Sequence, residues 1–323
     1  MEAFDWASFD GLGQTAALFS MYLPDIIEQH PEIRILSADM SYIAKLERFK
    51  ALYPDHFINV GIAEQNLIGI SAGLSAEGFQ CVALAQASFI TMRCFEQVRQ
   101  FMSYMQYPVI LVGLAGGFQL QFMGNTHFAL EDISLMRSIP GIVIYSPADA
   151  VEAVKAFQSA LTEKKPAYIR LTGAGAPDKV YQEDFKYDYR RAHCLRQGKE
   201  ISLLATGSMV SVALRTADLI EEQIDASVKV LDMHVLSPLD LDAVVGCRTS
   251  RIVVSLEEHY VTGGLGSAIA DATAQEKDYP PLLKLGIRNR YSEVGDYPYL
   301  LAQHRLSPES IAEDIIHFYR NYL

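Results

Sequence analysis

Short, apolar, β-rich runs alternate with longer segments of helical spacing along most of this chain, and this alternation constrains the fold more than any other feature. The runs carry apolar residues at consecutive positions, which indicates strands that are buried on both faces. Strands of this kind, separated by helices, form parallel sheets covered on both sides. In the first half they are predicted at Ile33–Leu36, Phe57–Val60, Cys81–Ala85, Pro108–Leu114, Ile142–Tyr145 and Ala167–Leu171.

The alternation is interrupted between Gly173 and Lys199 by a segment that is charged, aromatic and aperiodic. Such a segment is typical of a linker that lies on a surface. We therefore predict two doubly wound α/β domains, residues 1–175 and 199–323, each with a mostly parallel sheet covered by helices, joined by a linker at residues 176–198. The second domain is predicted to have strands at Ile201–Ala205, Val228–Leu231, Ile252–Leu256 and Leu282–Leu285, and helices at Met209–Glu222, from Ser237-Pro238 onward and at Pro308–Tyr319, with Ser208 and Ser307 as N-caps.

Composition limits the possible partners. Half of the residues are hydrophobic and 20% are charged, which is enough apolar material for two cores and excludes a disordered chain. The net charge of −12, without a basic cluster, argues against a nucleic acid or an anionic membrane as partner. The four cysteines stand far apart, so neither a metal site nor a disulfide framework is predicted.

Two further observations concern localisation. Residues 1–10 lack the positive flank and apolar core of a signal peptide. The longest apolar run, Pro108–Phe118, is too short to span a bilayer. We expect a soluble, cytoplasmic protein.

The segment from Asn59 to Leu74 has the pattern of a strand end, a glycine turn and a helix with small residues on its packed side. Glu64 falls in the first turn of this helix, where the helix dipole favours an ionised carboxylate. Open α/β sheets bind ligands at the carboxyl ends of their strands, which is where this turn lies. From the residues alone, Glu64 is either an ordinary first-turn carboxylate or part of a ligand site.

The sequence Gly61-Ile-Ala-Glu-Gln-Asn66, followed by Gly69 and Gly73, resembles the pyrimidine-binding (PYR) domain of the transketolase family, whose enzymes depend on thiamine diphosphate. Further motifs follow in the family's order. They are Ala87-Ser-Phe89 with Arg93, Gly124-Asn-Thr-His127, Glu131-Asp132, Met136-Arg-Ser-Ile-Pro140, Glu257–Ser267 and Gly286-Ile-Arg288. The resemblance covers the chain from about Gln14 onward, and it implies a PYR domain followed by a transketolase C-terminal domain.

The resemblance implies a site for thiamine diphosphate. Glu64 matches the glutamate that hydrogen-bonds a nitrogen of the aminopyrimidine ring and favours its proton-abstracting tautomer. Phe89 matches the aromatic residue on which the pyrimidine stacks, although its spacing alone also fits a core phenylalanine. Ile62 and Arg93 are expected beside the cofactor.

The resemblance also implies a substrate side. Thr126 and His127 match a pair that reaches the substrate, and we expect His127 to be catalytic because a histidine can donate a hydrogen bond or move a proton near neutral pH. Arg170 matches an arginine that binds substrate phosphate, with a strand-end salt bridge as the alternative. Met123 and Phe128 replace an aspartate and a glutamine of sugar-phosphate transketolases, which predicts an apolar substrate channel and puts ordinary pentose phosphates in doubt.

One half of the family's cofactor site is missing, because the magnesium motif Gly-Asp-Gly does not occur. The resemblance therefore implies the C-terminal subunit of a split transketolase, which transfers a two-carbon ketol unit from a ketose to an aldehyde. An N-terminal subunit would hold the diphosphate and Mg²⁺, most simply in an α₂β₂ heterotetramer, and this chain would be inactive alone. The alternatives are the β subunit of the thiamine-dependent component of a 2-oxoacid dehydrogenase and a non-catalytic regulatory subunit of the same fold.

Overall fold

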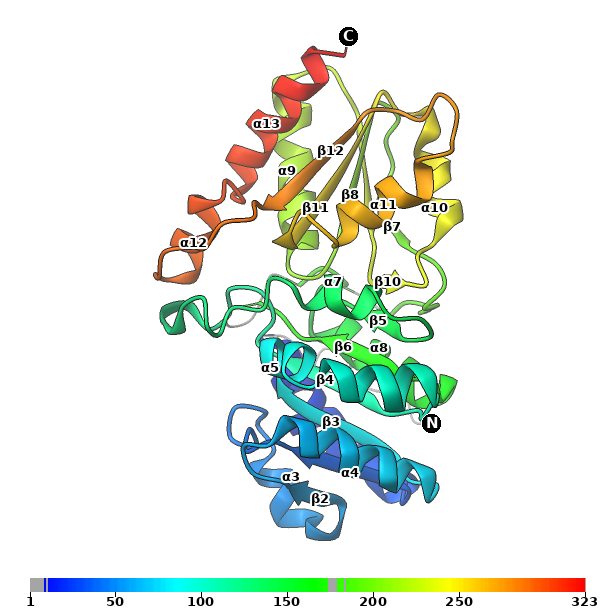
Figure 1. Ribbon diagram of the computed structural model, residues 1–323. Coiled ribbons are helices and arrows are strands. Elements are labelled where there is room, and N and C mark those ends of the chain that lie inside the picture. Colours follow the sequence, from blue (N-terminus) through cyan, green and yellow to red (C-terminus); the bar gives the residue numbers. More distant parts are fainter. Residues whose placement is uncertain (1–8, 10, 174–178, 183, 323) are drawn as a thin grey trace.

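Two lobes, one above the other in Figure 1, make up the computed structural model of this chain. It describes residues 9, 11–173, 179–182 and 184–322, so the predicted boundary at residues 175 and 176 lies outside the described residues, as does most of the segment 1–10. The strands are β1 (Ile33–Ser37), β2 (Phe57–Asn59), β3 (Gln80–Gln86), β4 (Ile110–Leu114), β5 (Val143–Tyr145), β6 (Ala167–Arg170), β7 (His193–Arg196), β8 (Ile201–Ala205), β9 (Val228–Asp232), β10 (Val235–Ser237), β11 (Ile252–Tyr260) and β12 (Leu282–Ile287). The α-helices are α1 (Gln14–Ala16), α2 (Leu23–Ile26), α3 (Glu47–Leu52), α4 (Glu64–Ala76), α5 (Ala87–Met92), α6 (Phe95–Gln97), α7 (Asp132–Arg137), α8 (Ala150–Glu163), α9 (Met209–Gln223), α10 (Leu241–Val245), α11 (Leu265–Thr273), α12 (Tyr297–Gln303) and α13 (Pro308–Arg320).

The first lobe is built on a seven-stranded sheet in the order β10-β5-β6-β4-β3-β1-β2. The strands run parallel to their neighbours, except that β10 is antiparallel to β5. The chain places β2 on one side of β1 and β3 on the other. The carboxyl ends of β2, β3 and β4 therefore meet at one edge of the sheet, beside the point where the direction of winding reverses.

Apolar residues at consecutive positions pack against helices on both faces of this sheet, because successive side chains of a strand point to opposite sides. In β3, Val82 and Leu84 join the core formed with α2 and α8, whereas Ala83 and Ala85 join the core formed with α4 and α5. Helices cover both faces, so the predicted doubly wound fold is confirmed.

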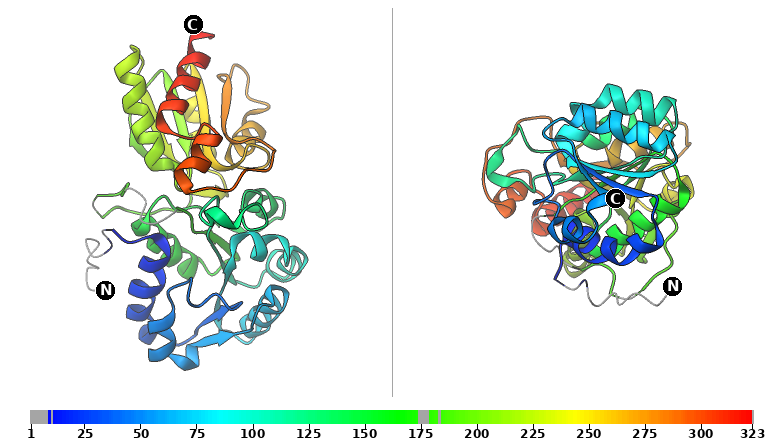
Figure 2. Two further views of the ribbon diagram at one scale, coloured as in Figure 1. Left: turned by 90° about the vertical axis from the view of Figure 1, so that its left-hand side faces the viewer. Right: turned by 90° about the horizontal axis from the view of Figure 1, so that it is seen from below.

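The second lobe has a five-stranded sheet in the order β12-β11-β8-β9-β7, in which β7 is antiparallel to β9 and the other neighbours are parallel. Helices α9 and α13 lie side by side on one face, as Figure 2 shows, and α10 and α11 pack into the core on the other. The hydroxyl of Ser307 accepts a hydrogen bond from the Ser310 N–H at 3.3 Å, which confirms the predicted cap of α13. None of the helices formed by the described residues is both long enough and apolar enough to cross a membrane.

Two local predictions in the second lobe are wrong. The helix expected to open at Ser237-Pro238 begins at Leu241 instead, because Ser237 ends strand β10 and the carboxylate of Asp240 caps α10. Ser208 precedes α9 but does not cap it with its side chain, because its hydroxyl donates a hydrogen bond to the buried carboxylate of Glu258.

The two lobes share strands across the predicted division of the chain. Strand β7 lies inside the segment expected to be linker and pairs with β9 of the second sheet. Strand β10 comes from the second half of the chain and pairs with β5 of the first sheet, with Val235 opposite Tyr145 and Ser237 opposite Ile144. The Ser146 N–H also donates to the carbonyl of His234 at 2.8 Å. Backbone hydrogen bonds thus connect the first sheet to the second half of the chain.

Candidate active site

The carboxyl edge of the first sheet brings together most of the residues predicted to bind cofactor and substrate. Glu64 begins α4, which follows β2, and Phe89 lies in α5, which follows β3 directly. Arg93 comes one residue after the end of α5, while Thr126 and His127 lie in the loop that follows β4. We call Glu64, Phe89, Arg93, Thr126 and His127 the site cluster. Their segments meet because β2, β3 and β4 end at the same edge.

Glu64, Arg93 and Phe89 form a continuous set of contacts. The Glu64 side chain is buried, and its Oε2 accepts a hydrogen bond from Nη1 of Arg93 at 2.8 Å. The Arg93 guanidinium lies over the Phe89 ring, 4.2 Å from its centroid, and 46% of the Arg93 side chain is exposed. A planar, nitrogen-bearing group is therefore stacked on Phe89 and hydrogen-bonded to Glu64 at the same time.

His127 completes the site cluster with a second contact to Phe89. The two rings meet edge to face, with centroids 5.4 Å apart. The carbonyl of His127 accepts hydrogen bonds from Nε2 of Gln86 at 2.8 Å and from the hydroxyl of Ser88 at 3.3 Å. Its ring Nδ1 lies 2.8 Å from the hydroxyl of Thr126. These contacts fix the backbone and the ring of His127 beside Phe89.

Other predicted residues lie on the open surface next to this cluster. Ile62, directly before α4, is 78% exposed, and Met123 is 56% exposed in the short helix Gln121–Met123. Phe128 is buried instead, edge to face with Phe118 at 4.9 Å, so the prediction that it lines a substrate channel is wrong. Its side chain belongs to the core that Phe118 and Leu130 form with the second lobe.

Arg170 does not join the site cluster. Its side chain is 2% exposed, and Nε donates to Oδ2 of Asp132 at 2.7 Å. Its Nη2 donates to the carbonyls of Ala129 at 2.9 Å and Glu258 at 3.0 Å. The structure thus favours the salt-bridge interpretation over the phosphate-binding one, because the guanidinium already donates hydrogen bonds to three groups of the protein.

Residues that sequence reasoning missed connect the site loop to the second lobe. Asn125 and Ser292 exchange two hydrogen bonds, from the Asn125 Nδ2 to the Ser292 carbonyl at 2.7 Å and from the Ser292 N–H to the Asn125 Oδ1 at 3.0 Å. Deeper in the junction, Glu258 accepts from the Phe118 N–H at 2.6 Å and from the Tyr297 hydroxyl at 2.7 Å. Burial raises the pKa of Glu258, although these donors oppose the rise. No spacing signal in the sequence links Asn125 to Ser292 or Phe118 to Glu258, because the partners of each pair lie more than 130 residues apart.

The chain matches known families over both lobes. The family described as transketolase, pyrimidine binding domain, matches residues 13–175, and the family described as transketolase, C-terminal domain, matches residues 190–311. The 6-deoxy-6-sulfo-D-fructose transketolase subunit SqwH of Clostridium sp. (strain MSTE9) is 33% identical over 90% of this chain and 89% of its own length. One of the subunits of the apulose-4-phosphate transketolase of Phocaeicola vulgatus is 30% identical over 93% of this chain and 96% of its own length.

A solved structure extends this comparison. A split gene transketolase, an inactive β4 tetramer, is 32% identical, with a TM-score of 0.86 over 97% of this chain and 100% of that one. Both lobes of the chain thus match transketolase domains in sequence, and the whole chain matches a transketolase subunit in fold. The chain belongs to the transketolase family, and membership implies the use of thiamine diphosphate.

Proposed function

We propose that this chain is the C-terminal subunit of a split transketolase that transfers a two-carbon ketol unit from a ketose to an aldehyde. The position of the Arg93 guanidinium carries the proposal. It is flat and bears N–H groups, and it stacks on Phe89 while it hydrogen-bonds to Glu64. An aminopyrimidine ring would make the same two kinds of contact in the same place, so the residues present fit thiamine diphosphate.

Each residue of this part of the site then has a role. When bound, the cofactor supplies an electron sink for breaking the carbon–carbon bond next to the ketose carbonyl. Glu64 would hold a proton between its carboxylate and a nitrogen of the ring, and α4 fixes its position. Phe89 would support the face of the ring, and Ile62 would cover it from the exposed side. Arg93 would swing toward solvent, for which its half-exposed side chain is suited.

His127 and Thr126 would act on the substrate side. The backbone of His127 is fixed by Gln86 and Ser88, so its ring can donate or accept a hydrogen bond at a defined point beside Phe89. The exposed side chains of Phe122 and Met123 add an apolar surface near this point. This surface supports a substrate with fewer hydroxyl groups, or differently placed ones, than an ordinary pentose phosphate.

A separate N-terminal subunit would hold the diphosphate and Mg²⁺, in an α₂β₂ assembly located in the cytoplasm. The absence of the Gly-Asp-Gly motif from the sequence supports this division. Apolar side chains beside the site cluster also support it, since Ile62 is 78% and Phe122 is 70% exposed, and such surfaces are typical of subunit interfaces. The related β4 tetramer is inactive, which supports the proposal that this chain is inactive alone.

The role of Glu64 is tested by Glu64→Gln in the complex of this chain with its N-terminal subunit. An amide cannot share the proton, so we expect exchange of the thiazolium C–H for deuterium, followed by NMR, to slow by about 10²–10⁴-fold. The matched control is Glu77→Gln, an exposed glutamate just beyond the other end of α4, which should leave the rate unchanged. Equal exchange in parent and Glu64→Gln complexes would mean that Glu64 does not serve the cofactor.

The division between two subunits is tested by calorimetry on this chain alone, titrated with thiamine diphosphate and MgCl₂. We expect no tight, magnesium-dependent binding and no ketol transfer until the N-terminal subunit is added. Tight binding together with activity of this polypeptide alone would rule out the split arrangement. Decarboxylation of pyruvate by the complex without an aldehyde acceptor would instead indicate the 2-oxoacid dehydrogenase class.

A further inference from the structure

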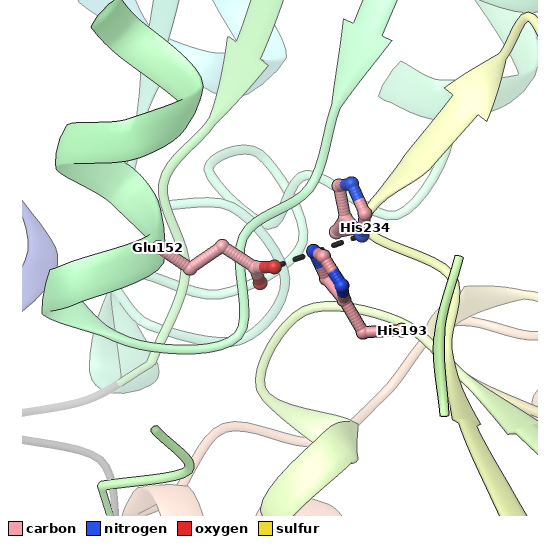
Figure 3. Close-up of side chains that lie close together, drawn as sticks. All are labelled: Glu152, His193 and His234. Carbon is pink, nitrogen blue, oxygen red and sulfur yellow. Dashed lines mark ion pairs between the residues drawn. The ribbon is translucent and has the colours of Figure 1, made fainter. Parts of the chain in front are cut away.

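A second cluster of polar side chains lies at the junction of the two lobes, away from the site cluster. Glu152 belongs to the first turn of α8, His193 begins β7, and His234 lies between β9 and β10. Figure 3 shows the three side chains meeting from these separate segments. One possible ligand atom from each lies within 4.8 Å of the others, and the Glu152 Oε1 is 3.7 Å from the His234 Nδ1. We call this group the junction cluster.

The ring of His234 is oriented so that one nitrogen faces the carboxylate. Its Nε2 lies 3.3 Å from the carbonyl of Asp188, which can only accept, so Nε2 carries the hydrogen. The lone pair is then on Nδ1, which is buried and has no hydrogen-bond partner among the described residues. A backbone carbonyl that holds the far nitrogen of a histidine in this way is a common feature of metal-binding histidines.

Two further polar atoms, one in the junction cluster and one beside it, also lack a hydrogen-bond partner. The Nε2 of His193 and the Oδ1 of Asp232 are both buried without a hydrogen-bond partner in the described part of the chain. The hydroxyl of Tyr181 lies 2.7 Å from the other oxygen of Asp232 and 3.2 Å from the Glu152 Oε1, so the two carboxylates share one small space. Buried polar atoms without partners are rare in folded proteins, and several together call for a ligand.

Carboxyl groups gather in the same place. The side chains of Glu152 and Asp232 are fully buried, and Asp149 lies one helical turn before Glu152. The ammonium of Lys155, which follows on α8, donates to Asp184 at 2.6 Å and to the carbonyl of Phe185 at 2.8 Å. A divalent cation between the Glu152 carboxyl group and the two imidazoles would give the unpartnered ring nitrogens a ligand.

We propose that Glu152, His193 and His234 bind a divalent transition-metal ion of the zinc class, which fastens the linker to both lobes. A set of two imidazoles and one carboxylate suits Zn²⁺, and Asp232 or a water would be the fourth ligand. Zinc–ligand distances of about 2.0–2.2 Å in a tetrahedron place neighbouring ligand atoms roughly 3.3 Å apart. The Glu152–His234 pair needs to close by only a few tenths of an ångström to reach this spacing.

His193 has further to move. Its ring stacks on that of His234, with centroids 4.4 Å apart and an angle of 16° between the planes, and two stacked rings cannot both direct a lone pair at one ion. Ion binding must therefore turn the His193 ring out of the stack. This residue is half-buried at the start of the edge strand β7, whereas Glu152 and His234 are buried.

The surroundings indicate a structural rather than a catalytic ion. Phe185 packs on His193 at 4.9 Å and Tyr187 packs on His234 at 4.8 Å, both from the segment that joins the lobes. Aromatic rings around the ligands limit the access of water and substrate. The ion would thus hold α8 of the first lobe, the joining segment and the end of β9 in one fixed arrangement.

The test uses the full chain, stripped with EDTA and dialysed against ZnCl₂ or CoCl₂. We expect about one metal ion per chain by mass spectrometry, the visible absorption of tetrahedral Co²⁺, and a higher melting temperature with metal than without. Changes around ligands lower metal affinity by about 10–100-fold, so losing a ligand in His193→Gln or Glu152→Gln should cost at least that much.

Two control variants separate this site from adventitious binding. Cys194→Ser removes an exposed thiol next to His193, and His317→Ala removes an exposed histidine of α13, and both should keep the metal. Circular dichroism of the metal-free variants checks that they fold. If Glu152→Gln does not fold, His193→Gln still tests the site, because His193 is only half-buried. Trace metal without a Co²⁺ spectrum, retention of metal by folded His193→Gln, or its loss in Cys194→Ser would each overturn the proposal.

Discussion

Replacing Arg170 by methionine should destabilise the fold and leave substrate affinity unchanged, if the salt bridge is its role. Methionine has a similar length and is apolar, so it fills much of the same space. The change removes the ion pair with Asp132 and the hydrogen bonds to the carbonyls of Ala129 and Glu258. Among the described residues, the Asp132 carboxylate, which is fully buried, would keep only the hydroxyl of Tyr168 as a hydrogen-bond donor, at 2.7 Å.

The expected magnitude follows from this burial. Removing one partner of a buried ion pair costs about 3–5 kcal/mol, because the remaining charge stays buried without compensation. The loss of the Arg170 donor at the Glu258 carbonyl would cost about 1–3 kcal/mol in isolation, but this loss overlaps with the first and is not added. The Ala129 carbonyl still accepts from the Gly117 N–H at 3.0 Å. Domains are stable by about 5–15 kcal/mol, so Arg170→Met should fold and unfold at a clearly lower urea concentration.

The assay is urea unfolding followed by circular dichroism, with Arg48→Met as the control because Arg48 is exposed. The double variant Arg170→Met/Asp132→Asn should recover part of the lost stability, since the unpaired charge is gone. The assembled enzyme is then assayed for KM. If Arg170→Met unfolded like Arg48→Met while KM for a ketose phosphate rose about tenfold, Arg170 would bind substrate and the structural argument would fail.

Two other predictions concern the junction between the lobes. Burial raises the pKa of Glu257 to about 7, so the folded chain keeps a proton that the unfolded chain releases near pH 4.5. The free energy of unfolding should therefore fall by about 3 kcal/mol as the pH rises from 4.5 to 7. Glu257→Gln should remove this part of the pH dependence in urea titrations, and an unchanged slope would contradict the assignment. Gly117 has φ +67°, and an added Cβ would lie 2.2 Å from Oε1 of Glu258. Gly117→Ala should therefore lower the free energy of unfolding by about 1–2 kcal/mol through backbone strain and by about 1–3 kcal/mol through displacement of Glu258. Gly78→Ala, at φ +93° with open space around it, isolates the backbone cost, and equal melting temperatures for the two variants would disprove the contact.

The strands and the start of α4 are predictable from the sequence because their signals are local. A buried strand is marked by its own run of apolar residues, and the turn at Gly61 places Glu64 at the first position of the helix. The site cluster is predictable for a different reason. The family resemblance identifies its members, and their segments follow β2, β3 and β4, whose carboxyl ends a parallel sheet brings to one edge.

The rest depends on contacts that no local pattern encodes. Arg170 is drawn into the protein by Asp132, 38 residues away, and by the second lobe, which supplies the carbonyl of Glu258. Phe128 follows a motif for a substrate loop, but its burial against Phe118 is decided by the packing of the junction. The residues of the junction cluster come from segments about 40 residues apart, with no spacing typical of metal ligands.

Strand β10 has a consequence for how this protein is made. A ribosome releases the chain from its N-terminus, so strands β1 to β6 emerge well before residues 235–237. Until then, β5 is the edge of the first sheet, and its unpaired backbone groups are open to pairing with another chain. The first lobe is therefore finished only after strands β7 to β9 of the second lobe have been synthesised. A gene fragment that ends at the domain boundary would encode a first sheet whose edge strand β5 is unpaired. The first domain therefore cannot be separated from the second without exposing this edge.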